Sequence, residues 1–470
     1  MQKQSNNIKV LYTYEYIIYI MNQKIDLVSR PKKSFWKLSI PIVAFCIFDA
    51  IYALVDMAWV SQISEDAFFA TGISIPIITL VLAFGDSLGQ GTNSLMSRFI
   101  GADNLTASYN TIIHGILLSI ILWLSVISFM AGIDFVLPYL GVDHAFNLIY
   151  AYLSPLCIFS FTFIFVNMFS ETLQTEGDSI RPTILIIGSN ILNMILDPIF
   201  IFDFNMGIAG VAYATILSSL IVFVSLLGLY LSGRTKVPLS FKYFKFEPYI
   251  VIEILKVALP NFINDSLWCF SALFINYILI STVGQIGVLL FTVSNKIRTL
   301  LTAPIRGFGR GLMSVTGHLF GARQFDDLKY MYYYVLRAGF LTMQIVMVLF
   351  NLFRDNIFAF FQIIGLSDSI AWIGIAGIIL MISVLLTMIS AKMLDGFGKS
   401  LYSLLLTILN IGLQAGFIYI LTMFFTDGSS VLIGVVASET ILAIIYFTLL
   451  HYMFKTMEVK YEDRETVKQI

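Results

Sequence analysis

The stretch GQGTNSLMSRFIGA, residues Gly89–Ala102, recurs 220 positions later in the chain as GRGLMSVTGHLFGA, residues Gly309–Ala322. The Gly-x-Gly, the serine three residues after it and the closing Gly-Ala keep the same register in both copies. Upstream of each copy, Ser39–Pro41 is matched by Ala258–Pro260. Similarity at a nearly fixed offset is typical of an internal repeat, so the chain is predicted to contain two copies of one unit.

The paired glycines of this repeat do not form a phosphate-binding loop, because no Lys-Ser/Thr follows them and no strand precedes them. Close approach of two helices, or a tight exit from a membrane, explains them better. They are Gly89, Gly91, Gly309 and Gly311.

The composition of the 470 residues indicates an integral membrane protein. The chain is 58% hydrophobic and only 12% charged, with a mean hydropathy of +0.87, whereas soluble domains carry about 25% charged residues. The 28 basic and 29 acidic residues nearly cancel, so the net charge gives no indication of a nucleic-acid partner.

The cysteines and histidines do not suggest a metal centre. The three cysteines lie in apolar runs without CxxC spacing, which predicts buried, unreactive thiols. The four histidines are scattered and match no metal-binding pattern. We expect no resident metal and no cofactor. These residues are Cys46, Cys157, Cys269, His114, His144, His318 and His451.

The first residues do not form a signal peptide. The apolar run Leu11–Met21 is short, is interrupted by Glu15 and is not followed by a small-residue cleavage site. Met21 is an alternative start of translation. Residues 1–33 are therefore expected to be a cytoplasmic extension.

Twelve stretches are long and apolar enough to cross the hydrocarbon core, which takes about 20 residues. Six spans per copy mean that both copies enter the membrane from the same side. We therefore predict an all-α integral membrane protein of two six-helix bundles, related by a pseudo-two-fold axis along the membrane normal. This frame is typical of secondary transporters. The expected spans are 36–61, 67–91, 108–132, 145–170, 180–202, 207–231, 253–281, 286–307, 330–352, 370–393, 400–425 and 431–453.

The spans divide the chain into an N-lobe (34–231), a cytoplasmic linker (232–252), a C-lobe (253–455) and a cytoplasmic tail (456–470). Basic residues gather in the loops of one side, and acidic residues predominate on the other, where Arg354 is the only clear base. By the positive-inside rule both termini are cytoplasmic.

Two carboxylates within spans are the first candidates for function, because an ionisable group in a membrane is costly unless it is paired or hydrated. Asp56 and Asp197 each lie about five residues before the outer end of a span, at a rise of about 1.5 Å per residue. They therefore share one depth. Asn193 lies one turn before Asp197, and Thr215 reaches a similar depth.

Further groups complete this candidate site. Tyr52 lies one turn before Asp56, and Pro198 lacks an N–H, so the carbonyl of Met194 is free to face a cation or water. Such oxygen groups suit a shared proton or a small hard cation such as Na⁺. The alternative is that these polar groups only tie helices together, which is about as plausible for Asn193 or Thr215 taken alone.

Several segments resemble the multidrug and toxic compound extrusion (MATE) family, in the branch related to DNA-damage-inducible protein F. The resemblance covers residues 34–455. Ala53 and Ser61 depart from the first-span signature, where the family has Asn and Gly. The segments are Leu54–Val60, Leu173–Gly177, Leu196–Pro198 with Asn193, and Gly207–Ala212 leading to Thr215.

This resemblance implies roles for individual residues. It implies an N-lobe cation site of Asp56, Asp197, Asn193, Thr215 and Tyr52. A first-span proline at which some relatives bend matches Pro41, so Pro41 and Pro198 are candidate hinges.

The C-lobe departs from the pattern of the other main bacterial branch, because Trp268 stands where that branch has a glutamate. Asp265 and Arg298 fall at similar depths and are expected to form a buried pair, with Lys296 near the cavity. Asp49 is a candidate residue of the substrate cavity, with a water-facing position in the inner vestibule as the alternative. Asp86, Glu176, Asp395 and Glu439 are expected to be gate or helix-cap residues.

The predicted function is secondary active antiport in the inner membrane of a prokaryote. A monomer exports cationic, amphipathic organic compounds in exchange for H⁺ or Na⁺. The alternative within transport is a flippase for a lipid-linked or polyanionic substrate, which Lys296, Arg298 and Arg306 favour weakly. An intramembrane enzyme is disfavoured because the sequence has no catalytic dyad or metal motif.

Overall fold

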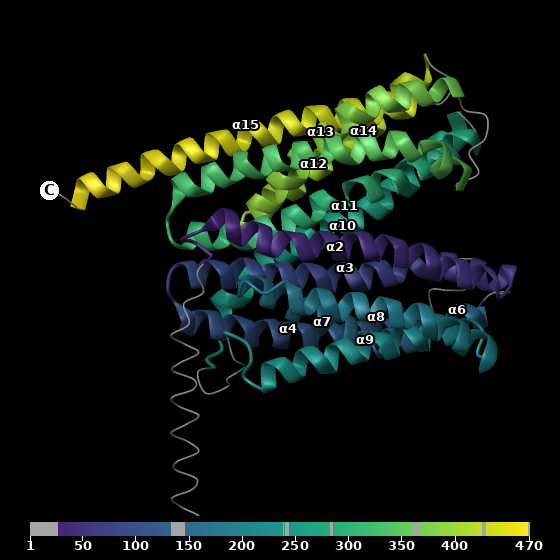
Figure 1. Cartoon of the computed structure of the whole chain (residues 1–470), viewed down its shortest axis with the longest axis horizontal. Helices are drawn as coiled ribbons and strands as arrows, with labels where there is room; N and C mark the ends of the chain where they lie inside the picture. The colour runs from purple at the N-terminus through teal and green to yellow at the C-terminus, as the bar shows by residue number, and fades with distance from the viewer. Residues whose placement is uncertain are drawn as a thin grey trace, which may run out of the picture.

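The computed structural model describes residues 27–132, 146–237, 239, 244–282, 285–360, 367–424 and 429–468. Over these residues every regular element is a helix. The long helices run roughly parallel and form two bundles that lie side by side (Figure 1).

The amino-terminal bundle contains the elements from α2 to α9. Two of its helices begin with a side-chain cap: Ser64 accepts from the N–H of Ala67 at 3.0 Å, and Asn104 accepts from that of Ala107 at 3.1 Å. The elements are α2 (Pro31–Ser61), α3 (Glu65–Gly101), α4 (Leu105–Ala131), α6 (Phe146–Ile158), α7 (Phe161–Thr175), α8 (Ile180–Pro198), the π-helical turn η3 (Ile199–Asp203) and α9 (Ile208–Leu231).

The carboxy-terminal bundle contains six long helices. They are α10 (Pro248–Thr282), α11 (Gln285–Gly321), α12 (Phe325–Phe360), α13 (Ser367–Gly396), α14 (Ser400–Thr422) and α15 (Ser429–Lys468).

These helices confirm the predicted all-α membrane architecture. In the described part of the chain, eight helices are long and apolar enough to span a membrane, and α6 with α7 makes a ninth. The helix order agrees with twelve spans if α6 and α7 form one span and α8 continues into η3. Helix α10 begins inside the expected linker, and α15 continues through most of the expected tail.

The fourth span is bent by 45° between α6 and α7. Pro155 lies inside α6 and removes a backbone donor. The carbonyl of Ile158, at the end of α6, accepts a hydrogen bond from the indole of Trp123 at 2.8 Å. This side-chain donor satisfies a carbonyl that the broken helix leaves open.

The first helix of each bundle packs mainly against the second helix of the other bundle. Helix α2 packs most extensively against α11, the second helix of the other half, and α10 packs most extensively against α3. The contacts of the two halves are therefore related in the way that the repeat predicts. In Figure 1, α2 lies between the two bundles.

Glycines near the carboxyl ends of α3 and α11 allow these two helices to pack closely against each other. A Cβ on Gly101 would collide with the carbonyl of His318, and one on Gly317 or Gly321 would collide with Ser97 or Arg98. Gly91 lies similarly close to the backbone of Ile254 in α10. Close helix approach is confirmed for Gly91, against α10, and for Gly311, where a Cβ would collide with Ser39 of α2. The α3/α11 contact closes the interface of the two halves at the Gly-Ala end of both motifs. We call the α3/α11 contact the glycine seam.

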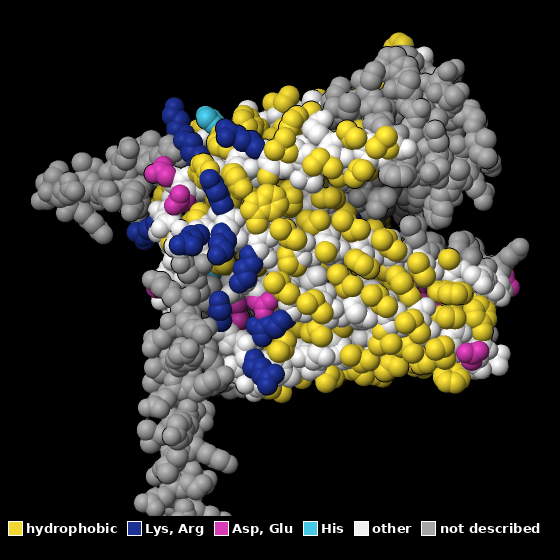
Figure 2. Space-filling view, in the orientation of Figure 1, with side chains coloured by type: hydrophobic (Ala, Val, Ile, Leu, Met, Phe, Trp, Pro, Cys, Tyr) yellow, Lys and Arg dark blue, Asp and Glu magenta, His cyan; other side chains and the backbone are white. Residues whose placement is uncertain are grey.

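The surface has the character of a membrane protein. Large apolar side chains cover the middle of the molecule, whereas lysine and arginine side chains gather at one end (Figure 2). Leu231 and Leu352, for example, are 71% and 72% exposed. Lipid contact is the natural environment for such side chains.

Candidate functional site

Asp197 and Asn193 face the interior of the amino-terminal bundle from the last two turns of α8. Asp197 is 0% and Asn193 1% exposed. The amide of Asn193 donates to Asp197 Oδ1 at 3.2 Å and to Thr215 Oγ1, on α9, at 3.3 Å. One amide therefore bridges two helices and orients the carboxylate.

The backbone next to Asp197 is irregular. Pro198 ends α8, and the chain continues at once into the π-helical turn η3. Single π turns widen a helix and are frequent at functional sites. Gly210 allows α9 to approach this turn closely, since a Cβ there would lie 2.8 Å from the carbonyl of Phe200.

Asp56 and Tyr52 come to the same region from α2. The charge of Asp56 acts on Asp197, and Tyr52 interacts with both carboxylates and with the side chain of Thr215. The charges of both carboxylates also act on Tyr152, from α6. The structure thus brings together the five residues that the sequence and the resemblance single out, and it adds Tyr152.

Three buried atoms of this N-lobe site have no hydrogen-bond partner among the described residues: Asp56 Oδ1, Asn193 Oδ1 and Asp197 Oδ2. All three are oxygen acceptors. Buried acceptors need a donor or a cation, because an unpartnered polar atom costs about 1–3 kcal/mol. A proton would convert one carboxylate oxygen into a donor, and a small hard cation would be coordinated by several of these oxygens.

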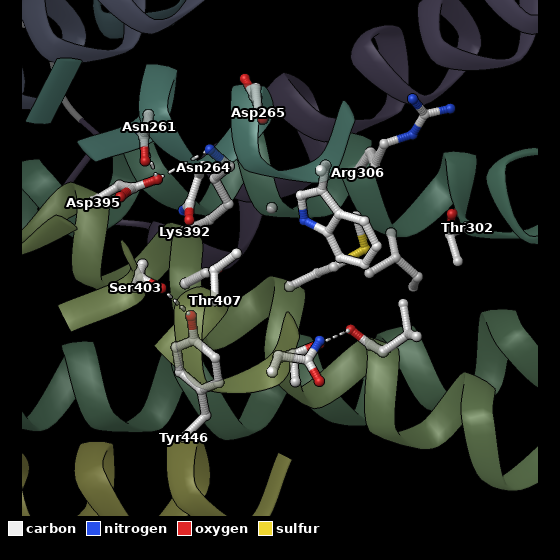
Figure 3. A pocket seen from close by; sticks show the side chains of 18 of the residues that line it. Asn261, Asn264, Asp265, Thr302, Arg306, Lys392, Asp395, Ser403, Thr407 and Tyr446 are labelled. Atoms are coloured by element: carbon white, nitrogen blue, oxygen red, sulfur yellow. Dashed lines mark hydrogen bonds and ion pairs between the residues drawn. The ribbon is translucent and has the colours of Figure 1, made fainter. Parts of the chain in front are cut away.

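A second polar region lies in the carboxy-terminal bundle. It is a cavity of about 430 Å³ whose walls come from α3, α10, α11, α13, α14 and α15. Figure 3 shows several of its polar side chains. The charged lining residues, which we call the C-lobe cavity charges, are Asp86, Asp265, Arg298, Arg306, Arg310, Lys392, Asp395 and Glu439.

Arg310 joins the two bundles. Its guanidinium donates to Asp86 at 2.7 Å and lies 3.8 Å from Glu171 of α7. Glu171 also accepts from the amide of Asn93 at 2.8 Å. That amide reaches Ser314 of α11 at 3.1 Å. Two acids of the N-lobe are therefore compensated by one base of the C-lobe.

Lys392 forms a second connection between the bundles. Its ammonium donates to Gln90 of α3 at 2.5 Å and to Asp395 at 3.0 Å. The amide of Asn261 bridges Gln90 and Asp395 at 3.1 and 3.2 Å, and Ser400 donates to Asp395 at 2.5 Å. Asp86 and Asp395, expected as gate or cap residues, are thus members of polar networks across the interface.

The expected pair of Asp265 with Arg298 is wrong. Arg298 instead lies 3.4 Å from Glu439 and stacks over the indole of Trp268, with its Cζ 4.9 Å from the ring centroid. Estimates of depth place residues along a helix axis but not around it, and Glu439 on α15 is on the side that Arg298 faces. The side chain of Lys296 lies outside the described residues.

Asp49 and Pro41 lie on α2, at the interface of the bundles. Asp49 is exposed, and its charge interacts with those of Arg306 and Arg310 without an ion pair to another described residue. Pro41 lies inside α2, which continues through it as one helix to Ser61. Asp49 is not among the residues that line the C-lobe cavity, so its place in a substrate cavity stays a prediction.

Glu176 lies beyond the end of α7, outside the spans. It is 1% exposed, and one of its oxygens accepts from the backbone N–H of Lys236 at 2.7 Å. Burial raises the pKa of Glu176 to about 8. This hydrogen bond holds the segment that connects the two bundles against the end of α7.

Gln90, Glu171 and Lys392 were missed by the sequence reasoning. Gln90 lies inside the repeated motif, next to Gly89 and Gly91, and this was the one local signal that pointed to it. Glu171 and Lys392 lie within apolar helices, where their charge alone marks them as candidates.

In the described part of the chain, no group of three or more His, Cys, Asp or Glu side chains is arranged to hold a metal ion.

Comparison with protein families and curated proteins places the chain among membrane transporters. A family model described as MatE matches residues 41–199 and 262–420, once in each half. The chain is 25% identical over 355 residues to the probable multidrug resistance protein YoeA of Bacillus subtilis, covering 71% of this chain and 74% of that protein. It is 23% identical over 299 residues to the multidrug export protein MepA of Staphylococcus aureus, covering 62% of this chain and 65% of MepA, which is under two thirds of its length.

Solved structures agree with this placement. A MATE protein in the straight conformation aligns with a TM-score of 0.88, and one in the bent conformation with 0.87, each at 28% identity over 93% of this chain and 99% of that chain. A transporter of the MOP superfamily from Pyrococcus furiosus, described as having a binding pocket of reverse polarity that suggests a different function, aligns with a TM-score of 0.86 at 28% identity over the same shares. The chain therefore belongs to the MatE family of multidrug efflux transporters, and it is not an enzyme.

Proposed function

We propose that the protein is an antiporter that exports cationic, amphipathic organic compounds in exchange for H⁺ or Na⁺ bound at the N-lobe site. The observation that carries the proposal is that Asp56 and Asp197 each have a buried carboxylate oxygen without a hydrogen-bond partner in the described part of the chain. In a membrane, two such carboxylates with no base beside them among the described residues call for a cation.

Each residue of the N-lobe site has a proposed role. Asp56 and Asp197 take up the ion, and Asn193 holds Asp197 in place from α8. Thr215 and Tyr52 supply hydroxyl groups from α9 and α2. Because Asp56 is on α2 and Asp197 on α8, one bound cation reduces the negative charge that these two helices share and weakens their mutual repulsion.

Ion uptake is proposed to change the shape of α2. Pro41 gives this helix a weak point, and the π turn after Pro198 gives α8 another. Relatives solved in straight and bent conformations support two states for this fold. The glycine seam holds α3 and α11 together at the Gly-Ala ends of their motifs. For the cavity to open on that side of the membrane, these two helices must separate there.

The distribution of basic residues supports an orientation of the protein in the membrane. The basic end of the molecule faces the cytoplasm by the positive-inside rule, which puts both termini there. The protein acts as a monomer in the cell membrane of a prokaryote, because each chain contains both lobes. The lobes comprise residues 34–231 and 253–455.

Inverted membrane vesicles test this proposal. Addition of a lipophilic cation should dissipate a preset pH or Na⁺ gradient in vesicles with the wild-type protein. The effect should disappear in Asp56→Asn and in Asp197→Asn at equal expression. Asp66→Asn, on the exposed start of α3, is the matched control. Unchanged coupling in both site variants would remove the N-lobe site from the mechanism.

The coupling ion is decided in proteoliposomes with only one gradient present. Uptake of the cation driven by a pH gradient in Na⁺-free buffer assigns H⁺. Uptake that requires Na⁺ at a uniform pH assigns Na⁺.

A flippase for a polyanionic, lipid-linked substrate is the second candidate. The bases Arg298, Arg306, Arg310 and Lys392 in the C-lobe cavity favour it, but the same walls carry four acids. A cavity for pyrophosphate would need an excess of positive charge. Translocation of a fluorescent lipid-linked phosphate in liposomes, without an ion gradient, would support this function over antiport.

A further inference from the structure

Basic and aromatic side chains gather where α2 and α12 begin, at the end of the molecule that is rich in lysine and arginine (Figure 2). Two surface pockets, of about 320 and 470 Å³, share the wall residue Tyr330. Their walls contain five bases but only two acids, so this region, which we call the interfacial patch, has an excess of positive charge. The bases are Arg30, Lys32, Lys33, Lys329 and Arg337, and the acids are Asp326 and Asp327.

Three of the five bases are available to a partner outside the protein. Arg30, Lys33 and Arg337 are exposed and form no ion pair with another described residue. The two acids of the patch are also exposed, and they lie in the first turn of α12, where a negative charge stabilises the start of a helix. The excess of positive charge therefore favours an anion at this surface.

Aromatic contacts hold the patch at the junction of α2 with α12. The ammonium of Lys32 lies over the rings of Tyr330 and Tyr334, 4.6 and 5.2 Å from their centroids. The indole of Trp36 donates to the hydroxyl of Tyr334 at 2.8 Å. Tryptophan and tyrosine near the end of a membrane helix are typical of the membrane–water boundary. The patch thus lies at the depth of the lipid headgroups and includes one helix from each bundle.

The exposed face of α12 continues from the patch as an apolar strip. Arg337, Leu341, Ile345 and Val348 follow one another at helical spacing, so they share one face. The three apolar side chains are 64%, 62% and 59% exposed. The eleven residues from Arg337 to Val348 rise about 16 Å, which is half of a hydrocarbon core of roughly 30 Å. The strip therefore has the length of the acyl chains of one leaflet.

We propose that the interfacial patch binds an anionic phospholipid of the adjacent leaflet, with the headgroup at the bases and the acyl chains along the apolar strip. Lys33 from α2 and Arg337 from α12 supply positive charge, and tyrosine hydroxyls can donate to the phosphate oxygens. A soluble phosphate would use the same bases but would leave the strip without a partner. The binding goes beyond the proposed function, since it needs neither the coupling ion nor a substrate.

A bound lipid of this kind connects the two bundles. Its headgroup contacts α2, the first helix of the amino-terminal bundle, and α12 of the carboxy-terminal bundle. A ligand that binds one arrangement of two elements better than another shifts the population toward it. The lipid therefore stabilises the arrangement in which the beginnings of α2 and α12 lie together.

Quenching of tryptophan fluorescence in nanodiscs tests the proposal on the full chain. The nanodiscs contain phosphatidylcholine and a rising mole fraction of phosphatidylglycerol whose acyl chains are brominated near the headgroup. Phosphatidylcholine with the same brominated chains is the comparison without net charge. In each protein, the difference from its Trp36→Phe counterpart isolates the signal of Trp36 and gives the mole fraction for half-maximal quenching.

In the wild type, phosphatidylglycerol should reach half-maximal quenching at a mole fraction lower by about tenfold or more than phosphatidylcholine. Lys33→Gln and Arg337→Gln should each reduce this preference by about fivefold, the contribution of one basic side chain near an anionic lipid. Asp327→Asn should increase the preference, because it removes an acid from the pocket wall. A loss of folded protein cannot produce an increase.

Lys245→Gln is the matched control for the loss of one positive charge. Lys245 is exposed in the segment between the bundles, and its backbone N–H donates to Asn110 of α4 at 3.3 Å, away from α12. The preference should stay at the wild-type value in this variant. A decrease as large as that in Lys33→Gln would overturn the proposal, because diffuse surface charge would then account for the preference. Equal mole fractions for the two lipids in the wild type would also overturn it.

Inorganic phosphate distinguishes a lipid from a soluble anion. At millimolar concentration it should leave the quenching by phosphatidylglycerol unchanged, because it cannot use the apolar strip. Displacement of the lipid by inorganic phosphate at this concentration would assign the patch to soluble phosphate compounds and overturn the proposed lipid site.

Discussion

The N-lobe site and the C-lobe cavity differ in whether their carboxylates are paired with basic side chains. Both hold buried carboxylates inside a membrane bundle. In the N-lobe, Asp197 accepts a hydrogen bond from the amide of Asn193, and neither Asp56 nor Asp197 forms an ion pair with a base among the described residues. In the C-lobe cavity, three of four acids are paired with Arg or Lys. A site that keeps its charge uncompensated is suited to a transient cation, whereas a paired site holds the fold together.

The sharpest test of this difference is Asp197→Asn. We expect export to fall by roughly 100-fold, because the coupling of ion binding to transport is lost. The melting temperature should stay equal or rise, since a repulsive charge is removed from a buried site. Measurement of export and of thermal unfolding on the same preparation checks both statements. A large drop in melting temperature would show that Asp197 is structural like the acids of the C-lobe.

Arg310→Gln should give the opposite result. Removal of the guanidinium leaves Asp86 and Glu171 without their base, which costs about 3–5 kcal/mol for a buried pair. The second substitution Asp86→Asn should restore part of this loss. Thermal unfolding in nanodiscs measures both, with Arg234→Gln at an exposed position beyond the end of α9 as the control. An unchanged melting temperature in Arg310→Gln would contradict a structural role for this network.

The glycine seam between the two regions is the next target. Gly317→Leu would push a side chain into Ser97, and overpacking of this kind costs roughly 2–3 kcal/mol. Gly228→Leu is the matched control, because a Cβ there has nothing within 4 Å. If the two variants unfold at the same temperature, the close packing of α3 against α11 does not stabilise the protein.

The smallest effect is expected at Glu176. Its ordinary pKa of 4.5 is raised to about 8 by burial. Between these values the folded protein keeps a proton that the unfolded chain has released, so the free energy of unfolding falls as the pH rises. From pH 6 to pH 8 the loss should be about 2 kcal/mol. Glu176→Gln cannot ionise and should abolish this part of the pH dependence; a slope identical to that of the wild type would exclude Glu176 as its source.

The sequence predicted the N-lobe site better than the C-lobe cavity for a physical reason. Asn193 and Asp197 are one turn apart on a single helix, so their contact follows from helix geometry alone. Equal depth on two spans then brought Asp56 into the same site. By contrast, Gln90 and Lys392 are 302 positions apart, and their contact depends on how whole helices rotate and cross.

The fold was predictable to a similar degree. Hydropathy and the repeat gave the number of helices and the two bundles. They did not predict the bend between α6 and α7, where the opened carbonyl of Ile158 accepts a hydrogen bond from Trp123 on another helix. They also could not choose Glu439 over Asp265 as the partner of Arg298, since that choice depends on the direction in which each side chain leaves its helix.

The packing of each first helix against the other bundle has a consequence for biogenesis. Helix α2 finds its most extensive partner in α11, whose first residue is synthesised 254 positions after the start of α2. At about 5–20 residues per second, α2 waits in the lipid for tens of seconds before that partner emerges. During this interval Asp56 lacks the completed bundle around it. The amino-terminal half cannot complete its packing before α11 of the other half has been synthesised.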